Sequence, residues 1–184
     1  MLDRALIDHA SPTLAHLKLG SLFTFRIDGD FYQEFAMLRD QLNEKGVTLT
    51  LLRVREGIAL IYLYREKELN FALNDDAIWT FLMSCGYERR ETAPVLRRLR
   101  ERIKSSRDFP HEIGVFLGYP LADVIGFIDN QGRDCLACGA WKVYSNACEA
   151  LRAFERYRKC KAVYQKLFAS GCPLSRLTVA ARGA

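Results

Sequence analysis

Several features that identify common classes of protein are absent from this chain of 184 residues. It has no G-x-x-x-x-G-K phosphate loop, no G-x-G-x-x-G after a strand, no H-E-x-x-H zinc motif and no G-x-S-x-G nucleophile elbow. It has only 12 glycines and 5 prolines, which argues against a collagen-like or disordered chain. The common nucleotide-binding, metalloprotease and hydrolase classes are therefore disfavoured.

Long apolar runs are also missing. The richest apolar stretch, residues 57–64, is flanked by charged residues and is typical of a strand rather than of a membrane span. The first eight residues carry Asp3 and Asp8, which do not belong in the apolar core of a signal peptide. We therefore expect a cytoplasmic protein without membrane contact, whose six cysteines are reduced thiols or metal ligands.

The charge of the chain is close to balanced. There are 27 Lys and Arg against 22 Asp and Glu, a net charge of +5 without long cationic tracts, so composition alone indicates no partner and gives no support to nucleic-acid binding. Hydrophobic residues make up 49% of the chain, enough to bury a sizeable core without disulfides or metals. The length predicts a single domain over residues 1–184.

Hydrophobic periodicity predicts a helix followed by a hairpin in the first third of the chain. A helix is expected over residues 31–45, with Gly46 as its stop. The segments 47–54 and 58–65 are rich in β-branched, Leu and Tyr residues and predict an antiparallel hairpin. The residues expected on the buried face of the helix are Phe31, Phe35, Leu38 and Leu42.

Further helices are predicted on both sides of the hairpin. Ser11 as N-cap and Pro12 in the first turn predict a short helix that ends near Gly20. Later helices are expected at residues 67–73, 75–85, 92–105 and 146–169, and a third strand at residues 140–144. Because strands and helices do not alternate, we expect an α+β fold with a small, mainly antiparallel sheet, formed by the hairpin plus a later strand. Several helices would pack on it, including the long C-terminal one.

Residues 109–128 contain the most informative pattern. Two short helices joined at Gly118 are predicted, with Asp108 as cap of the first, Gly118 as its left-handed end and Pro120 at the start of the second. Gly114 and Gly118 are four residues apart on one face, so they allow another backbone to approach closely.

Two motifs in this stretch carry a family resemblance: Pro-His-Glu at residues 110–112 and Leu-Gly-Tyr-Pro at residues 117–120. With the Trp-Lys-Val-Tyr strand at 141–144 and the Lys159-Cys160 pair, the chain resembles an uncharacterised bacterial family of unknown function, found mostly in clostridial-type anaerobes. The resemblance covers nearly the whole chain, from residues 12–14 and Lys18 onward. Members often carry a cysteine near Ala10 or Ser11, and its absence here argues against an amino-terminal thiol nucleophile. The resemblance brings no established activity, and the cofactor is unknown.

The same stretch contains the candidate catalytic residues, His111 and Glu112. An imidazole beside a carboxylate can transfer protons or hold a ligand. The alternative interpretation is that one of the two caps a backbone N–H and fixes the turn. Whether the protein is an enzyme stays open.

The candidate ligand-binding residues surround these two in the predicted fold. Lys142 and Tyr144 share one face of a strand, where they can bind an anion or form the solvated side of the sheet. We expect a pocket for a small anionic ligand or cofactor between the helix pair and the strands. Its predicted lining residues are Arg53, Arg65, Tyr119, Lys142 and Tyr144.

Cys135 and Cys138 form a C-x-x-C knuckle followed by a glycine, a turn that suits a zinc or iron ion. A second pair at knuckle spacing is missing, although Cys148 can fold back toward the first. Thiol redox chemistry is a further alternative, but the motif precedes a strand and does not resemble a thioredoxin site. Burial as small hydrophobic groups is the simplest role for the other cysteines, such as Cys160.

Two alternatives to a ligand pocket belong to other functional classes. The helix pair fits the spacing of a helix-turn-helix, but its second helix offers Asp123 and Asp129 where a DNA reader needs Arg, Lys, Asn or Gln, so nucleic acid is an unlikely partner. An accessory protein, for example in redox or iron metabolism, can instead present basic helices to an acidic partner. The cations in question are Arg97, Arg98, Arg100, Arg102, Lys104, Arg107, Arg152, Arg156, Lys159 and Lys166.

Overall fold

The predicted hairpin forms the larger part of a three-stranded antiparallel sheet. In the computed structural model, which describes residues 1–105 and 109–181, strands β2 (Val47–Arg55) and β3 (Ile58–Arg65) are joined by a two-residue turn. Both turn residues have positive φ, 51° at Glu56 and 73° at Gly57, the backbone that lets a tight turn follow the strand twist. Strand β1 (Gly20–Arg26) pairs with the other edge of β3, so the order is β1-β3-β2.

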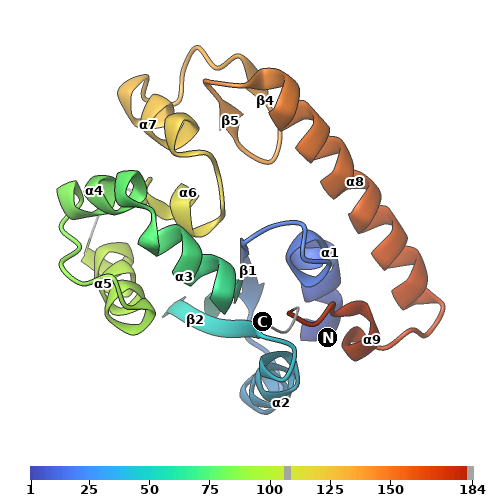
Figure 1. Ribbon diagram of the computed structural model, residues 1–184. Helices are drawn as coiled ribbons and strands as arrows, with labels where there is room; N and C mark the ends of the chain where they lie inside the picture. Colours follow the sequence, from blue (N-terminus) through green and yellow to red (C-terminus); the bar gives the residue numbers. More distant parts are fainter. Residues whose placement is uncertain (106–108, 182–184) are drawn as a thin grey trace.

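The central strand β3 is buried on both faces because helices cover the sheet on each side (Figure 1). Successive side chains point to opposite faces of a strand. Accordingly Ile61 and Leu63 belong to one core cluster, and Leu60, Tyr62 and Tyr64 belong to the other. A near-continuous apolar sequence is what such a doubly covered strand requires.

The first face is covered by helices from both ends of the chain. They are α1 (Leu2–Leu14), α2 (Phe31–Asn43) and α9 (Leu174–Leu177). The predicted apolar stripe of α2 is confirmed, since Phe31, Phe35, Leu38 and Leu42 are its buried residues, and Gly46 has the positive φ expected after a helix end.

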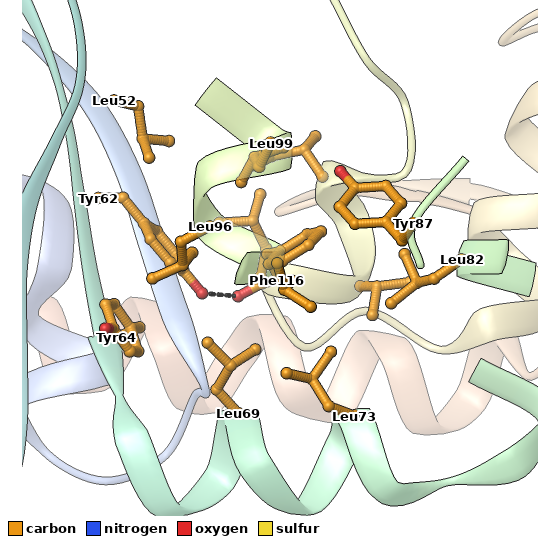
Figure 2. Packing of buried hydrophobic residues seen from close by; sticks show 14 of the residues in the cluster. Leu52, Tyr62, Tyr64, Leu69, Leu73, Leu82, Tyr87, Leu96, Leu99 and Phe116 are labelled. Carbon is orange, nitrogen blue, oxygen red and sulfur yellow. Dashed lines mark hydrogen bonds between the residues drawn. The ribbon is translucent and has the colours of Figure 1, made fainter. Parts of the chain in front are cut away.

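The second face is covered by helices from the middle of the chain, whose packing is shown in Figure 2. The hydroxyl of Tyr62 crosses this core and donates a 2.6 Å hydrogen bond to the carbonyl oxygen of Phe116. The three helices predicted here are confirmed to within two residues at each end. The helices that contribute are α3 (Glu66–Asn74), α4 (Asp76–Ser84), α5 (Thr92–Ser105) and α6 (Ile113–Phe116).

The prediction of a helix from Pro12 to Gly20 is wrong. The helix runs over Leu2–Leu14, and Pro12 lies in its last turn, where the missing proline N–H leaves only one helical bond unmade. His16, with a φ of 60°, follows the helix end. Gly20 starts β1 instead: a Cβ there would lie 2.6 Å from the oxygen of Phe116, so glycine allows the strand to approach α6.

The third strand also differs from the prediction, although the α+β class and the small antiparallel sheet are confirmed. The strand that completes the sheet is β1, which precedes the hairpin, rather than a later one. Residues 142–143 form β5 (Lys142–Val143), which pairs with β4 (Ala137–Cys138) in a separate two-stranded ribbon.

The ribbon, helix α7 (Leu121–Asp129) and the start of α8 (Ala147–Ala169) lie at the end of α8 opposite to α9 (Figure 1). The long C-terminal helix is confirmed, with the Asn146 side chain accepting from the N–H of Glu149 as its N-cap. Only Ala150 and Ala153 of α8 are fully buried. In the part of the chain that the structure describes, no helix has the length and apolar character needed to cross a membrane.

Candidate functional site

A pocket of about 350 Å³ lies between α6, α7 and the ribbon. It combines apolar and aromatic walls with a few polar groups, as small-molecule sites generally do. The residues that line it are His111, Ile113, Gly114, Tyr119, Asp123, Val124, Phe127, Cys138, Gly139, Trp141 and Lys142.

The turn between α6 and α7 shapes one side of this pocket. Gly118 has a φ of 74°, as predicted, and a Cβ there would lie 2.8 Å from that of Leu19, so glycine is needed for both conformation and packing. At Gly114 a Cβ would lie 2.7 Å from Val124, which brings α7 close to α6. The predicted cap Asp108 lies outside the described residues.

Asp123 holds the ribbon against α7. Its Oδ2 accepts a 2.7 Å bond from the Trp141 indole N–H, and its Oδ1 accepts bonds of 2.8 Å from the N–H of Tyr144 and from the N–H and hydroxyl of Ser145. Burial alone raises the pKa of this carboxyl, but these hydrogen bonds outweigh it and hold the pKa below its ordinary value. The side chain that we expected to repel DNA phosphates is instead a buried structural centre.

Aromatic contacts complete the wall formed by the ribbon. Trp141 stacks on Tyr119 with centroids 5.0 Å apart and meets the ring of Phe154 of α8 edge-on at 4.5 Å. The Tyr119 hydroxyl donates to the carbonyl oxygen of Ala140, and burial raises the pKa of this tyrosine to about 12. The ring of Phe154 leaves no room for a side chain at Gly139, where a Cβ would lie 2.2 Å away.

His111 and Lys142 are the groups of the pocket that can carry positive charge. The imidazole of His111 meets Phe127 edge-on at 5.0 Å. The Lys142 ammonium donates to the Gly132 carbonyl at 2.6 Å and lies 5.9 Å from the centroid of the same Phe127 ring. Phe127 therefore separates two cationic or proton-donating groups on one side of the pocket.

Glu112 points away from the pocket, although it follows His111 directly. Its carboxylate is 3% exposed, forms an ion pair with Arg102 of α5 and accepts a 3.3 Å hydrogen bond from the Tyr87 hydroxyl. Burial raises the pKa of Tyr87, and the hydrogen bond to Glu112 raises that of Arg102. The structure therefore does not bring the two predicted catalytic residues together.

Three of the predicted ligand-binding residues also lie elsewhere. Arg53 pairs with Leu60 at a bulge in β2. Arg65 is fully buried and donates to the carbonyl oxygens of Thr13, Leu14 and Val179, and burial lowers its pKa. The ring of Tyr144 packs against Gly126 outside the pocket lining, and its hydroxyl is buried with no hydrogen-bond partner among the described residues.

Cys135 and Cys138 lie side by side at the ribbon, with their sulfurs 2.9 Å apart. Cys138 is exposed and lines the pocket, whereas Cys135 is half-buried. The hydrogen bond between the two thiols raises the pKa of Cys135. Among residues 1–105 and 109–181 there is no group of three or more His, Cys, Asp or Glu arranged to hold a metal ion.

The predicted basic surface of α5 is partly used inside the molecule. Arg98 donates to the carbonyl of Gly86, Arg100 to that of Leu51, and Arg102 pairs with Glu112. Arg107 lies outside the described residues. In the helix pair, α6 spans only four residues. Three of the cations named on α5 therefore have partners within the molecule, and Arg97 stays exposed.

Some residues at or near the pocket were not singled out by sequence reasoning. Phe127 and Trp141 form much of the pocket wall, yet nothing in their spacing marks them as neighbours of His111. Lys18 lies with its ammonium 5.0 Å from the centroid of Tyr119, and burial lowers its pKa to about 8. The sequence did not predict that Lys18 contacts Tyr119, because the segment before β1 was expected to be helical.

Fold and site together define an α+β protein with a small aromatic pocket between a helical turn and a β-ribbon. A family model, DUF3793, described as a protein of unknown function, matches residues 6–178, and the chain therefore belongs to that family. The predicted resemblance to an uncharacterised family is confirmed at this level. Neither the curated proteins nor the solved structures contain a match to the chain.

Proposed function

We propose that the pocket between α6, α7 and the ribbon binds a small ligand that combines a flat apolar part with an anionic group. One observation carries the proposal: an aromatic hollow of about 350 Å³ has Lys142 and His111 beside it. Pockets of this size and character bury a small molecule, and a few polar groups then fix its orientation.

The charge balance of the pocket supports an anionic ligand. Asp123 is the carboxylate in the lining, but both of its oxygens already accept hydrogen bonds, from Trp141 on one side and from residues 144 and 145 on the other. Both of its oxygens therefore already have donors, and a ligand need not supply one. Lys142 remains to attract an anion, and a charge-assisted hydrogen bond contributes about 1.5–3 kcal/mol.

The flat part of the ligand is expected to lie against Trp141 and Phe127. Both rings belong to the lining, and they come from different elements, Trp141 from the ribbon and Phe127 from α7. Aromatic rings contribute more than their buried area when they stack in an offset or edge-on arrangement.

If a reaction takes place in the pocket, His111 is the group placed to transfer the proton. It is in the lining, and the neighbouring Glu112 is committed to Arg102 on the other side of the chain. A histidine can act in this way without a carboxylate partner because its two ring nitrogens can donate and accept protons. Binding is thus the primary function we propose, and acid–base catalysis by His111 is its extension.

Binding can be tested with 2-naphthoate as the probe and 2-naphthamide as its uncharged match. The Trp79→Phe protein leaves Trp141 as the only tryptophan, so quenching of its fluorescence reports on the pocket. We expect naphthoate to saturate the signal, and Lys142→Gln to weaken it about tenfold while leaving the amide unaffected. Lys159→Gln on the exposed face of α8 is the matched control and should change nothing. Equal affinity for the acid and the amide, or no saturable binding of either, would overturn the proposal.

A further inference from the structure

The two cysteines of the ribbon are positioned more closely than a metal site requires. Two sulfurs bound to one tetrahedral zinc ion, each about 2.3 Å from the metal, are about 3.8 Å apart. The sulfurs of Cys135 and Cys138 are 2.9 Å apart, and no third ligand stands near them among the described residues. This separation lies between that of a zinc-bound pair and the bond length of a disulfide, which is about 2.05 Å.

The ribbon places one cysteine of the pair in a strand, and Cys135 lies three residues before it. Cys138 belongs to β4 and pairs in register with Lys142 of β5. The next residue, Gly139, is pressed against the ring of Phe154, and the far end of the ribbon is held by Asp123. The two sulfurs are therefore adjacent before any bond forms between them.

From this arrangement we propose that Cys135 and Cys138 are a redox dithiol, which closes to a disulfide by exchange with a small disulfide molecule. The proposal does not depend on the anionic ligand, since it needs only the two thiols and access to one of them.

Exposure assigns the two roles. Cys138 is exposed and faces the pocket, so it is the thiol that an incoming disulfide can reach, whereas the half-buried Cys135 is the resolving thiol. Lys142 lies opposite Cys138 in the ribbon and supplies a positive charge beside the pair. The attacking form is the thiolate, which forms when Cys138 releases its proton to solvent.

The exchange balances without any further reactant. Cys138 loses its proton to solvent, and its thiolate attacks one sulfur of the small disulfide, which releases the first thiol and leaves a mixed disulfide on Cys138. Cys135 then loses its proton and attacks the Cys138 sulfur, which releases the second thiol and forms the Cys135–Cys138 bond. Two electrons pass from the protein to the small disulfide, which is reduced to two thiols.

The test uses the full chain, reduced and then exposed to glutathione disulfide as the probe, with products identified by mass spectrometry of alkylated peptides. We expect one reversible disulfide between Cys135 and Cys138 and no glutathione retained on either of these two residues. Cys135→Ser should stop at the mixed disulfide on Cys138, and Cys138→Ser should slow the reaction about tenfold because the less accessible thiol must attack. Cys148→Ser, which removes an exposed cysteine of α8, is the matched control and should behave as the unmodified protein.

Two results would overturn the proposal. One is glutathione that stays on Cys138 when Cys135 is present, which would mean that Cys135 does not resolve the mixed disulfide. The other is a reduced protein that holds one zinc ion and loses it in Cys135→Ser, which would make the pair a metal site. Failure of the ligand proposal would appear separately, as naphthoate binding that does not respond to Lys142→Gln.

Discussion

The three-stranded sheet and the region of the pocket are held together by different interactions. At the sheet, β3 is covered on both faces, and residues such as Ile61 and Leu63 are fully buried among apolar neighbours. At the pocket, the two short strands of the ribbon are held by the hydrogen bonds of one carboxylate, Asp123, and by rings around Trp141. The stability of the sheet therefore comes from apolar burial spread over many residues, whereas that of the pocket region depends on a few polar and aromatic contacts.

This difference in interactions implies a difference in local stability between the two regions. A core that is buried on two faces resists local opening, while a small hydrogen-bonded unit can open by itself at lower free energy. The pocket and the cysteine pair are both in the second kind of region. We therefore expect changes in the ribbon to affect binding while the sheet stays folded, and changes in the sheet to affect the whole molecule.

The largest effect is expected from Leu63→Ala at the centre of the sheet. Leu63 is fully buried, and removal of such a side chain leaves a cavity that costs about 2–5 kcal/mol of unfolding free energy. Denaturant unfolding monitored by circular dichroism measures this loss. Naphthoate affinity should stay unchanged until the protein unfolds globally. Loss of naphthoate binding at a lower denaturant concentration than unfolding of the sheet would contradict this expectation.

The next effect is expected from Asp123→Asn. The amide keeps the size of the side chain, but one of its two oxygens becomes an NH₂ group that cannot accept from Trp141 or Ser145, at a cost of about 1–3 kcal/mol. Hydrogen exchange should accelerate at the amides of residues 137–145 and not at those of β3. Asp129→Asn, at the exposed end of α7, is the control. Equal acceleration in the sheet would show that the two regions are one cooperative unit.

Acid should release the ribbon in a similar way. The folded protein holds the pKa of Asp123 below the ordinary value of 3.8, so this carboxylate stabilises the fold above pH 4 and loses its contribution as the pH falls through the lowered pKa. In the Trp79→Phe protein, the fluorescence of Trp141 should change below about pH 4. The change should be absent in Asp123→Asn, and a transition that persists there must come from another group.

The smallest effects separate the two neighbours at residues 111 and 112. Glu112→Gln removes the charge that pairs with Arg102 in the core and should lower stability by about 1–2 kcal/mol without changing naphthoate affinity. His111→Ala should weaken naphthoate binding severalfold and leave the melting temperature nearly unchanged, since its ring is at the pocket surface. If Glu112→Gln reduced binding as strongly as His111→Ala, the assignment of the two residues to separate regions would be wrong.

Most of the fold was predictable because its signals are local. The stripe of Phe31, Phe35, Leu38 and Leu42, the Glu56-Gly57 turn and the glycine at 118 each fix their own element. The failures began at Pro12, which marks a helix start in isolation but lies in the last turn of a helix that the buried Leu6, Ala10 and Leu14 hold in place. The misplaced helix then concealed β1, whose pairing with β3 depends on residues about 40 positions further along the chain.

The site was predictable only in part, because side-chain direction is set by tertiary contacts. His111, Tyr119, Lys142 and Cys138 do line one pocket. Glu112 does not, since Arg102 and Tyr87 draw its carboxylate into the core, a pairing that no spacing in the sequence shows. Arg65 likewise meets its acceptors through the packing of α1 on the sheet, which cannot be read from the hairpin alone.

Arg65 also bears on the order in which the chain can fold during synthesis. Its guanidinium bonds carbonyl oxygens of Thr13 and Leu14, made early, and of Val179, made late, while the N–H of Val179 donates to Leu14. The end of the first helix therefore reaches its final set of partners only after residue 179 has left the ribosome. Such distant closure slows folding, because the entropy of a long loop is lost before its contacts form. The apolar face of α1 can pack on β1 and β3 earlier than this, so the junction at the end of the helix closes after the face has been covered.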